Sequence, residues 1–280
     1  MKTASTVAFS NFYRSLKSPE NRIVRDQISN LQKTFRALQV LDFTNENLTN
    51  FFREVGYIEP VRTGGERYYR KQELEVSEIL PNGSNFPMFL DSLTPSLRRA
   101  FSNWVEEIFG YGVELSPSAG HISINLTAGE NSVNVKDTGY GVSQILPVLA
   151  SVWWAGRRPS SRWLSPLDRM QTARTLAIEQ PELHLHPAHQ AKLADVFVRG
   201  IKKDDNRPPT NFIIETHSES LINRLGELVE DGELDKDDVQ VVIFSALDDI
   251  NSPTEISLAK FNERGALSNW PFGFFNYTNS

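Results

Sequence analysis

Two short apolar stretches of the chain each end in a side chain suited to phosphate chemistry. The first, Thr175-Leu-Ala-Ile-Glu179, ends in a carboxylate and continues through Gln180 into a proline turn. A carboxylate at the tip of a buried strand can hold Mg²⁺ through water beside a nucleotide, so we assign the metal role to Glu179. The Gln180 amide can orient an attacking water but cannot accept its proton, which predicts slow catalysis or a base elsewhere.

The second stretch, Asn211–Glu215, is followed by His217 and then by Ser218, a predicted N-cap of the next helix. A histidine at a strand tip can hydrogen-bond a phosphate oxygen or the attacking water, and so sense whether a triphosphate is present. Ligands of parallel sheets bind at the carboxyl ends of the strands. His217 therefore joins Glu179 and Gln180 as a predicted catalytic residue.

A glycine-rich segment, Asp137-Thr-Gly-Tyr-Gly-Val-Ser-Gln144, leads into an apolar helix that continues to Trp154. The start of a helix presents free backbone amides to an anion, and glycines let the backbone approach that anion closely. The residues that we expect to bind the gamma-phosphate of a nucleotide held by a partner subunit are Gly139, Gly141, Ser143 and Gln144.

The elements that must position these residues alternate between strand and helix in the last part of the chain. Strands are predicted at 175–179, 211–215 and 239–245, and helices at 188–201 and 218–230, which indicates an α/β fold with a parallel sheet flanked by helices. A helix at 97–109 and a hairpin of 122–126 with 132–136 precede the glycine-rich segment. Residues 1–100 are predicted to be mostly helical, with helices at 23–40 and near 46–55, and residues 101–280 to form the α/β domain.

Composition indicates a globular protein without a membrane span. The chain has no cysteine, which excludes disulfides and thiolate zinc sites, and no apolar run or signal peptide of the required length, so the cytoplasm is its expected location. Residues 1–100 hold 14 Lys/Arg against 11 Asp/Glu, and residues 101–280 hold 15 against 24. This basic excess permits DNA contact through the first part or through Arg157, Arg158 and Arg162, but an excess so small is more often a solvated face.

Three segments together resemble the ABC-type ATPases of the SMC and OLD-like group (AAA_15- and AAA_21-like): Asp137–Pro147, Ile178–Gln190 and Ile213–Leu225. They correspond to the signature, the Walker B strand with its D-loop, and the switch histidine. The Glu-Gln-Pro-Glu sequence at Walker B is similar to one subgroup, as are two further blocks, Tyr57–Tyr69 and Trp270–Phe275. The resemblance covers about residues 57–275.

The resemblance implies a P-loop NTPase fold of ABC type, with ATP and Mg²⁺ as cofactors. It places His184 and His186 in the D-loop, and it implies that the signature completes the nucleotide site of an opposing subunit. The implied partners are a second copy of the ATPase or a P-loop-bearing half, with a nuclease effector and DNA as further candidates. Relatives act in DNA repair and anti-phage defence. No acidic nuclease cluster follows His217, so any nuclease is expected on a partner.

A phosphate-binding loop of the form Gly-x-x-x-x-Gly-Lys-Ser/Thr does not occur in the sequence. The nearest glycine pair, Gly64-Gly65, lacks the lysine and the hydroxyl. The first sheet strand, the P-loop and the Q-loop of the family are therefore expected on another polypeptide or on a missing segment, or residues 1–56 have replaced them. In the last case the chain is a degenerate, non-hydrolysing lobe that acts as a scaffold or sensor.

Two sets of polar residues near Walker B allow more than one interpretation. The spacing of His184, His186 and His189 resembles that of a metal site. The first two flank apolar residues and precede a proline, however, so metal binding is the less favoured interpretation. Glu182 is a substitute base or an acid at a helix start, and we favour the second because first-turn acids are common.

Overall fold

The computed structural model describes residues 22–72, 76–157, 174–201, 210–245 and 254–269. The chain forms two compact units, Met1–Arg53 and Glu54–Ser280. The described part of the first unit is one helix, α2 (Arg22–Arg53), where the sequence suggested two. No glycine or proline interrupts this stretch, so nothing in it forces a break. Val55, predicted at the end of the second helix, instead begins strand β1 (Val55–Ile58).

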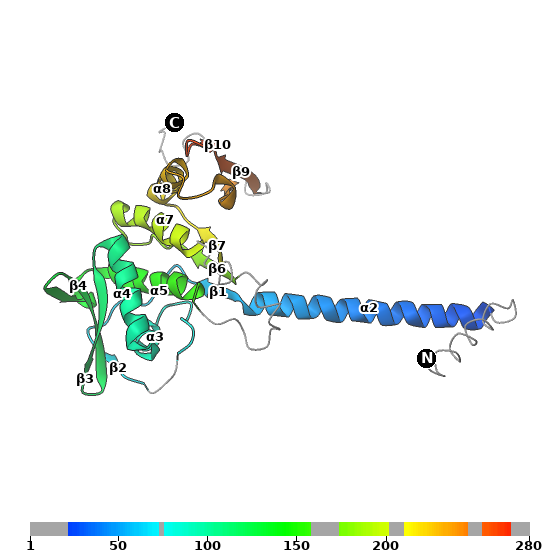
Figure 1. The fold of residues 1–280 in the computed structure, drawn as a ribbon, viewed down its shortest axis with the longest axis horizontal. Helices are drawn as coiled ribbons and strands as arrows, with labels where there is room; N and C mark the ends of the chain where they lie inside the picture. Colours follow the sequence, from blue (N-terminus) through cyan, green and yellow to red (C-terminus); the bar gives the residue numbers. More distant parts are fainter. Residues whose placement is uncertain (1–21, 73–75, 158–173, 202–209, 246–253, 270–280) are drawn as a thin grey trace, which may run out of the picture. The chain divides into compact units, whose positions relative to one another are not determined.

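The second unit contains the predicted parallel sheet. Its strand order is β1-β6-β7, with β6 at Arg174–Glu179 and β7 at Thr210–Glu215. Both pairings are parallel, and Glu179 lies directly opposite Glu215 in the register. The buried pair of Arg174 with Glu54, at 3.2 Å, fixes the first residues of this sheet. The carboxyl ends of all three strands therefore lie along one edge (Figure 1).

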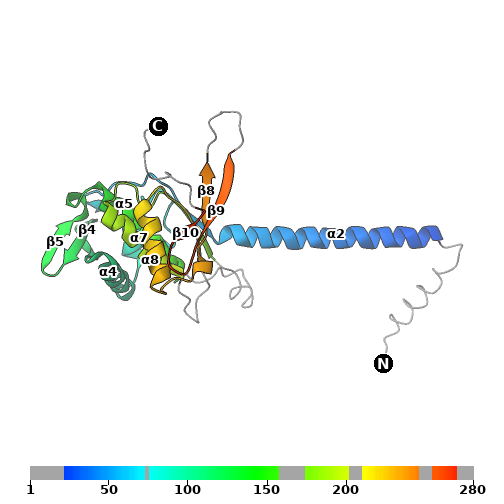
Figure 2. The same ribbon diagram turned by 90° about the horizontal axis from the view of Figure 1, so that it is seen from above.

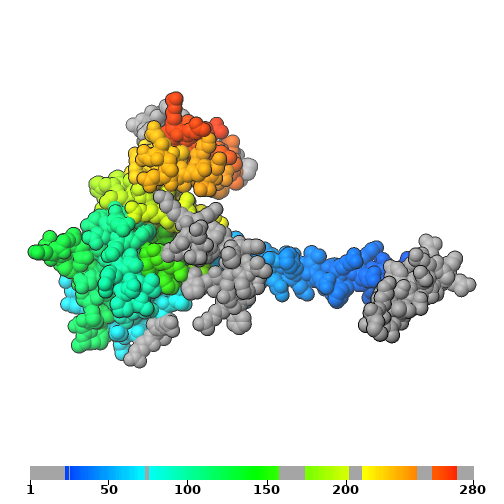
Figure 3. Space-filling view, in the orientation of Figure 1, coloured from blue at the N-terminus to red at the C-terminus, as the bar shows by residue number. Residues whose placement is uncertain are grey.

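Helices cover the sheet and supply the core: α3 (Phe86–Ser92), α4 (Pro95–Phe109), α5 (Tyr140–Ala155), α7 (Pro187–Ile201) and α8 (Glu219–Glu230). Helix α5 contacts β6, α4 and α7, and α7 packs on α8 (Figures 1 and 3). Trp153 of α5 is buried against Phe101 of α4, with ring centroids 5.4 Å apart. The helices predicted at 97–109, 188–201 and 218–230 are present within a few residues.

An antiparallel sheet precedes α5. It consists of β2 (Tyr69–Arg70), β3 (Gly112–Ser118), β4 (His121–Ala128) and β5 (Asn131–Asn134), with β4 pairing to the other three. The predicted hairpin is β4–β5, and it turns through Gly129 at a positive φ of 59°. A short 3₁₀ turn, η2 (Val135–Asp137), then connects the hairpin to the glycine-rich segment.

Strand β8 (Val241–Ser245) does not join the parallel sheet as the alternation suggested. It pairs antiparallel with β9 (Glu255–Phe261), which pairs with β10 (Leu267–Ser268), after the 3₁₀ turn η3 (Lys236–Asp238) (Figure 2). The next strand along the chain, β9, thus pairs with β8 in place of the expected parallel neighbour. A second difference concerns the boundary: the compact unit begins at Glu54 rather than at residue 101, because α3 and α4 share the core of α5.

Some predictions fall outside the described residues, namely those for Arg158, Arg162 and the Trp270–Phe275 block. The guanidinium of Arg157 lies over the ring of Trp153 at 4.3 Å from the centroid. Within the described ranges, no helix combines the length and apolar character that a membrane crossing requires.

Candidate functional site

Glu179 ends β6 at the carboxyl edge of the parallel sheet, as predicted. Its Oε1 accepts a hydrogen bond of 2.8 Å from the hydroxyl of Tyr57, which lies on the neighbouring strand β1. This hydrogen bond, followed by desolvation and the negative charge of Glu179, raises the pKa of Tyr57 above its ordinary value. Tyr57 thus fixes the carboxylate from one side and stays protonated at neutral pH.

Gln180, directly after Glu179, has a left-handed backbone with φ of 41°. Non-glycine residues seldom adopt this conformation, and where they do it is often at a functional site. Three hydrogen bonds hold it: its N–H donates to the carbonyl of Glu215, and its carbonyl accepts from Nη2 of Arg62 at 3.1 Å and from the N–H of Leu183 at 3.2 Å. The backbone is therefore turned sharply where the candidate water-positioning residue sits.

His217 follows β7 with a largely exposed imidazole. Its Nε2 lies 3.7 Å from Oε1 of Glu215, so a protonated ring would pair with that carboxylate. Ser218 caps α8 as predicted, accepting from the N–H of Leu221 at 3.1 Å. Glu179 and His217 thus project from adjacent strands at the same edge.

Glu182 has a different position from the one favoured by sequence. It lies in the turn after Gln180, well before α7 begins at Pro187, so it is not a helix-start acid. The side chain is buried, and its Oε1 accepts a 2.6 Å hydrogen bond from the backbone N–H of His217. Its Oε2 finds no hydrogen-bond partner in the described part of the chain. Glu182 therefore ties the turn after β6 to the loop that follows β7.

Arg62 joins the two halves of the site through its guanidinium. This fully buried side chain donates to four backbone carbonyls, those of Glu59, Gln144, Glu179 and Gln180, at 2.8 to 3.3 Å. Burial lowers the pKa of Arg62 to about 10, partly offset by the charge of Glu182, so the group remains charged at neutral pH. In return, the Gln144 amide donates to the carbonyl of Arg62. Helix α5 is thereby bound to the turn after Glu179.

The glycine-rich segment begins α5 as predicted, with Gly139 as its N-cap at φ of 96°. A Cβ on Gly141 would meet the carbonyl oxygen of His184 at 2.3 Å, so only glycine fits this contact. Ser143 is buried, and its hydroxyl donates to the carbonyl of Tyr140 at 2.7 Å. Gln144 is fully buried against Arg62, which gives it a structural contact in place of the exposed position expected for a nucleotide ligand.

The glycine pair Gly64-Gly65 packs on this same segment. A Cβ at Gly64 would lie 2.8 Å from the ring of Tyr140, and one at Gly65 would lie 2.9 Å from Cβ of Ser143. Gly65 thus lets this loop lie close against the start of α5, while the contact at Gly64 is with the end of the exposed Tyr140 ring. The segment is thus held on one side by Gly64-Gly65 and on the other by the backbone of His184.

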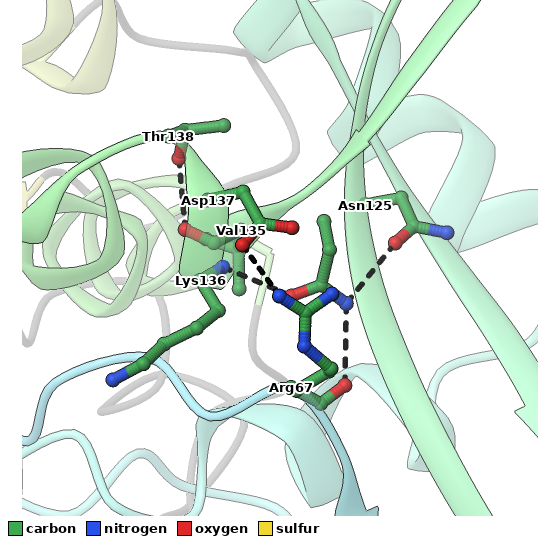
Figure 4. Close-up of polar contacts among 7 residues, drawn as sticks. Arg67, Asn125, Val135, Lys136, Asp137 and Thr138 are labelled. Atoms are coloured by element: carbon green, nitrogen blue, oxygen red, sulfur yellow. Dashed lines mark hydrogen bonds and ion pairs between the residues drawn. The ribbon is translucent and has the colours of Figure 1, made fainter.

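A polar network anchors the loop just ahead of Gly139 (Figure 4). Nη2 of Arg67 donates to Oδ1 of Asp137 at 2.6 Å, and the Asn134 amide donates to the carbonyl of Arg67 and to Oδ1 of Asn125. The Thr138 hydroxyl donates to the carbonyl of Val135. Exposed pairs of this kind add little stability, but they restrict the conformations of the loop.

The three histidines that follow Glu179 in the chain contact different neighbours. His184, at φ of 65°, places its exposed ring edge-on to Tyr140 with centroids 5.1 Å apart. Nδ1 of His186 accepts from the N–H of Ala188, and the ring of His189 packs on Phe109. Burial, then the charges of Lys192 and His186, lowers the pKa of His189. Across the described residues, no three His, Asp or Glu side chains are arranged to hold a metal.

Two side chains of this site, Tyr57 and Arg62, were not assigned roles from sequence. Both belong to the Tyr57–Tyr69 block, whose resemblance to the family was the available signal. Their contacts join residues more than 80 positions apart, which no local pattern reveals.

Comparison with known proteins gives one family match. The model described as AAA ATPase domain (AAA_15) matches residues 8–222, so the match includes residues 8–56, which lay outside the sequence resemblance. A search of curated proteins gave no match.

Several solved structures are similar at low identity. One, from work on ATP-driven dimerization and DNA-stimulated activation of SMC ATPases, is 13% identical with a TM-score of 0.39, covering 64% of this chain and 89% of that one. A second is a Pyrococcus furiosus Smc head domain with an extended coiled coil bound to the C-terminal domain of ScpA. It is 16% identical with a TM-score of 0.36, covering 59% of this chain and 34% of that one. A third, an SmcHead bound to the C-winged helix domain of ScpA, is 15% identical with a TM-score of 0.36, at 59% and 42% coverage.

Proposed function

Because the chain belongs to the AAA ATPase domain family, with residues 8–222 matched, we propose that it is an ATP-binding and ATP-hydrolysing subunit whose nucleotide site is completed by another polypeptide or by a segment beyond residues 1–280. The observation that carries the proposal is the shared edge of β6 and β7. There, Glu179 ends β6, His217 lies two residues after the end of β7, and the Tyr57 hydroxyl donates to the Glu179 carboxylate. Ligands of parallel α/β sheets bind at this edge.

The residues at this edge fit a magnesium ion bound with ATP. Glu179 offers a carboxylate whose Oε2 is not used by the Tyr57 hydrogen bond, and an oxygen ligand of this type suits Mg²⁺. When bound, the ion would neutralise charge on the phosphates. Tyr57 restricts the rotamers of Glu179, and His217 provides an imidazole toward the gamma-phosphate.

Water positioning falls to Gln180 in this proposal. Its strained backbone is held by Arg62 and by the carbonyl of Glu215. This fixes the point from which the side-chain amide of Gln180 extends. Glu182 is buried and bonded to the backbone of His217, which argues against its use as the base. The proton acceptor then comes from the nucleotide or from the completing polypeptide.

The phosphate-binding loop must come from outside residues 1–280, because this sequence has none. Candidates are a separate P-loop-bearing half or a missing segment of the same protein. The family match to residues 8–56 argues against replacement of the P-loop region by unrelated sequence. The signature residues Gly139, Gly141 and Ser143 then serve the site of an opposing copy, with the D-loop residues His184 and His186 beside them.

The wider role that we propose is control of a DNA-directed complex in repair or anti-phage defence, with any nuclease on a partner. One observation favours the second candidate, a non-hydrolysing scaffold: Ser143 is only 8% exposed and its hydroxyl is already engaged with Tyr140. In the scaffold reading, the signature segment is a packed loop and not a phosphate ligand.

The test is Mg²⁺-dependent ATP hydrolysis by the complex that co-purifies with the chain. Glu179→Ala and His217→Ala should reduce turnover to that of a protein-free blank, while Glu130→Gln, an exposed carboxylate in the β4–β5 turn, should leave it unchanged. If the intact complex neither binds nor hydrolyses ATP, the ATPase proposal fails and the scaffold candidate takes its place.

A further inference from the structure

A buried carboxylate without an assigned role, that of Glu182, lies beside the proposed catalytic residues. The side chain is only 7% exposed, so it does not face solvent at the carboxyl edge of the sheet. Its Oε1 accepts a 2.6 Å hydrogen bond from the backbone N–H of His217. Its Oε2 has no hydrogen-bond partner among the described residues. The hydrogen bond of this acid is therefore made to the backbone of a residue that carries a proposed catalytic side chain.

This hydrogen bond is strong enough to hold a loop in place. A carboxylate is costly to bury unless hydrogen bonds or opposite charge compensate for the lost water. A hydrogen bond from a backbone N–H to a carboxylate is about twice as strong as one between neutral groups. Glu182 and His217 lie 35 positions apart, so the bond joins the turn after β6 to the loop after β7.

The same loop is held at the next residue as well. The hydroxyl of Ser218 donates to Oε1 of Gln190 at 2.7 Å, and Gln190 lies on α7. The side-chain amide of Gln190 also donates to the carbonyl of Leu185, three residues after Glu182. The backbone at residues 217 and 218 is thus tied to the turn after β6, while the imidazole of His217 extends from it with a side-chain exposure of 72%.

We propose that Glu182 is a positioning residue, which sets the place of the His217 imidazole by holding its backbone N–H. This inference rests on the ATPase function proposed above, because that function gives His217 its catalytic role. A shift of the His217 backbone would move the ring relative to Glu179, whose carboxylate accepts from the Tyr57 hydroxyl. A misplacement of about 1 Å can cost roughly 100-fold in rate. What the site requires at Glu182 is an oxygen acceptor at the position of Oε1.

The acceptor and the charge of Glu182 need separate variants. Burial lowers the pKa of Arg62, and the charge of Glu182 partly offsets this effect, so the charge has an influence of its own. Glu182→Gln keeps a carbonyl oxygen that can take the place of Oε1, but it has no charge and cannot accept a proton. Glu182→Asp keeps the charge, but it is one methylene shorter, so its carboxylate is withdrawn from the His217 N–H.

ATP hydrolysis by the co-purifying complex compares these variants. Glu182→Asp should lower turnover by roughly 100-fold, and Glu182→Gln should stay close to the unaltered complex. Glu219→Gln, which removes an exposed carboxylate two residues after His217, is the control and should leave turnover unchanged. If Glu182→Gln were as slow as Glu182→Asp, Glu182 would act as a base or through its charge, and the proposal would be wrong. Full turnover in Glu182→Asp would overturn it as well.

The backbone amide of His217 tests the hydrogen bond without ATP. The chain has five histidines, so isotope labelling of histidine nitrogen in the full chain gives five backbone amide signals in nuclear magnetic resonance spectra. His217→Gln removes one of them and so identifies it. This signal should lie downfield in the unaltered protein and in Glu182→Gln, and should move upfield in Glu182→Asp. An amide that does not respond would overturn this inference alone, whereas an unaltered complex without ATPase activity would overturn the proposed function.

Discussion

The hydroxyl of Tyr57 donates a 2.8 Å hydrogen bond to the carboxylate of Glu179 across two neighbouring parallel strands. The two residues are far apart in sequence, and the register of β1 with β6 brings them together. Deprotonation of Tyr57 would place a second negative charge beside Glu179, so the pair is stable only while the phenol keeps its proton.

Removing the carboxylate should lower the pKa of Tyr57. In Glu179→Ala the hydrogen bond and the neighbouring charge are both lost, so tyrosinate should form at a lower pH than in the unaltered protein. Ultraviolet titration, with Tyr57→Phe subtracted to isolate this phenol, measures the change. Glu114→Ala, on the exposed side of β3, is the control and should not move the titration. An unchanged pKa in Glu179→Ala would show that the two side chains do not interact in solution.

Arg62 should be among the most sensitive positions of the second unit. Arg62→Met leaves four carbonyls without their donor and the buried charge of Glu182 without its neighbour, which should cost about 3–5 kcal/mol in the free energy of unfolding. Arg67→Ala breaks only an exposed pair and should cost at most about 1 kcal/mol. Urea unfolding compares the two variants. Equal costs would show that the four hydrogen bonds of Arg62 do not stabilise the fold as expected.

The contact between Gly141 and His184 predicts a steric effect. In Gly141→Ala the new Cβ meets a carbonyl oxygen of the D-loop, and the required shift should cost about 1–3 kcal/mol of stability. Gly156→Ala is the matched control, because nothing lies near its Cβ and its φ is −74°. Thermal unfolding should separate the two variants, and a neutral Gly141→Ala would mean that the loops are not in contact.

The strained backbone at Gln180 predicts a trade between stability and activity. Gln180→Gly removes the penalty of a left-handed side-chain residue, so the free energy of unfolding should rise by about 1 kcal/mol. The same change removes the amide that positions water, so turnover of the complex should fall. Lys192→Gly, in the interior of α7, should instead lower the free energy of unfolding by about 1 kcal/mol. Denaturant unfolding and ATPase assays together check this, and a destabilised Gln180→Gly would count against strain at this turn.

Sequence patterns predicted the parallel arrangement around Glu179 and His217 well because apolar strands and capped helices are local features. Alternating residues identified the β4–β5 hairpin, and Ser218 marked the start of α8. The order of strands within the sheet was not accessible in this way. Strand β8 shows why. Its own residues predict a strand, but its antiparallel pairing depends on β9, which follows it in the chain.

The polar contacts that hold the candidate site were harder to predict. The residues around Glu182 are typical of the first turn of a helix. In the structure Glu182 is instead buried, and its carboxylate accepts a hydrogen bond from the backbone N–H of His217. Gln144 occupies a helix start suited to ligand binding, yet Arg62 engages it from more than 80 positions away. Such long-range hydrogen bonds leave no periodic trace in the sequence.

In the composite site that we propose, Glu179 of one copy of the chain acts together with the signature segment of another copy. Mixing Glu179→Ala and Ser143→Ala chains within the ATPase complex tests it most directly, because each mixed pair contains one site with both groups intact. We expect that neither variant hydrolyses ATP alone and that the mixture regains part of the unaltered turnover. A mixture as inactive as its two components would contradict it.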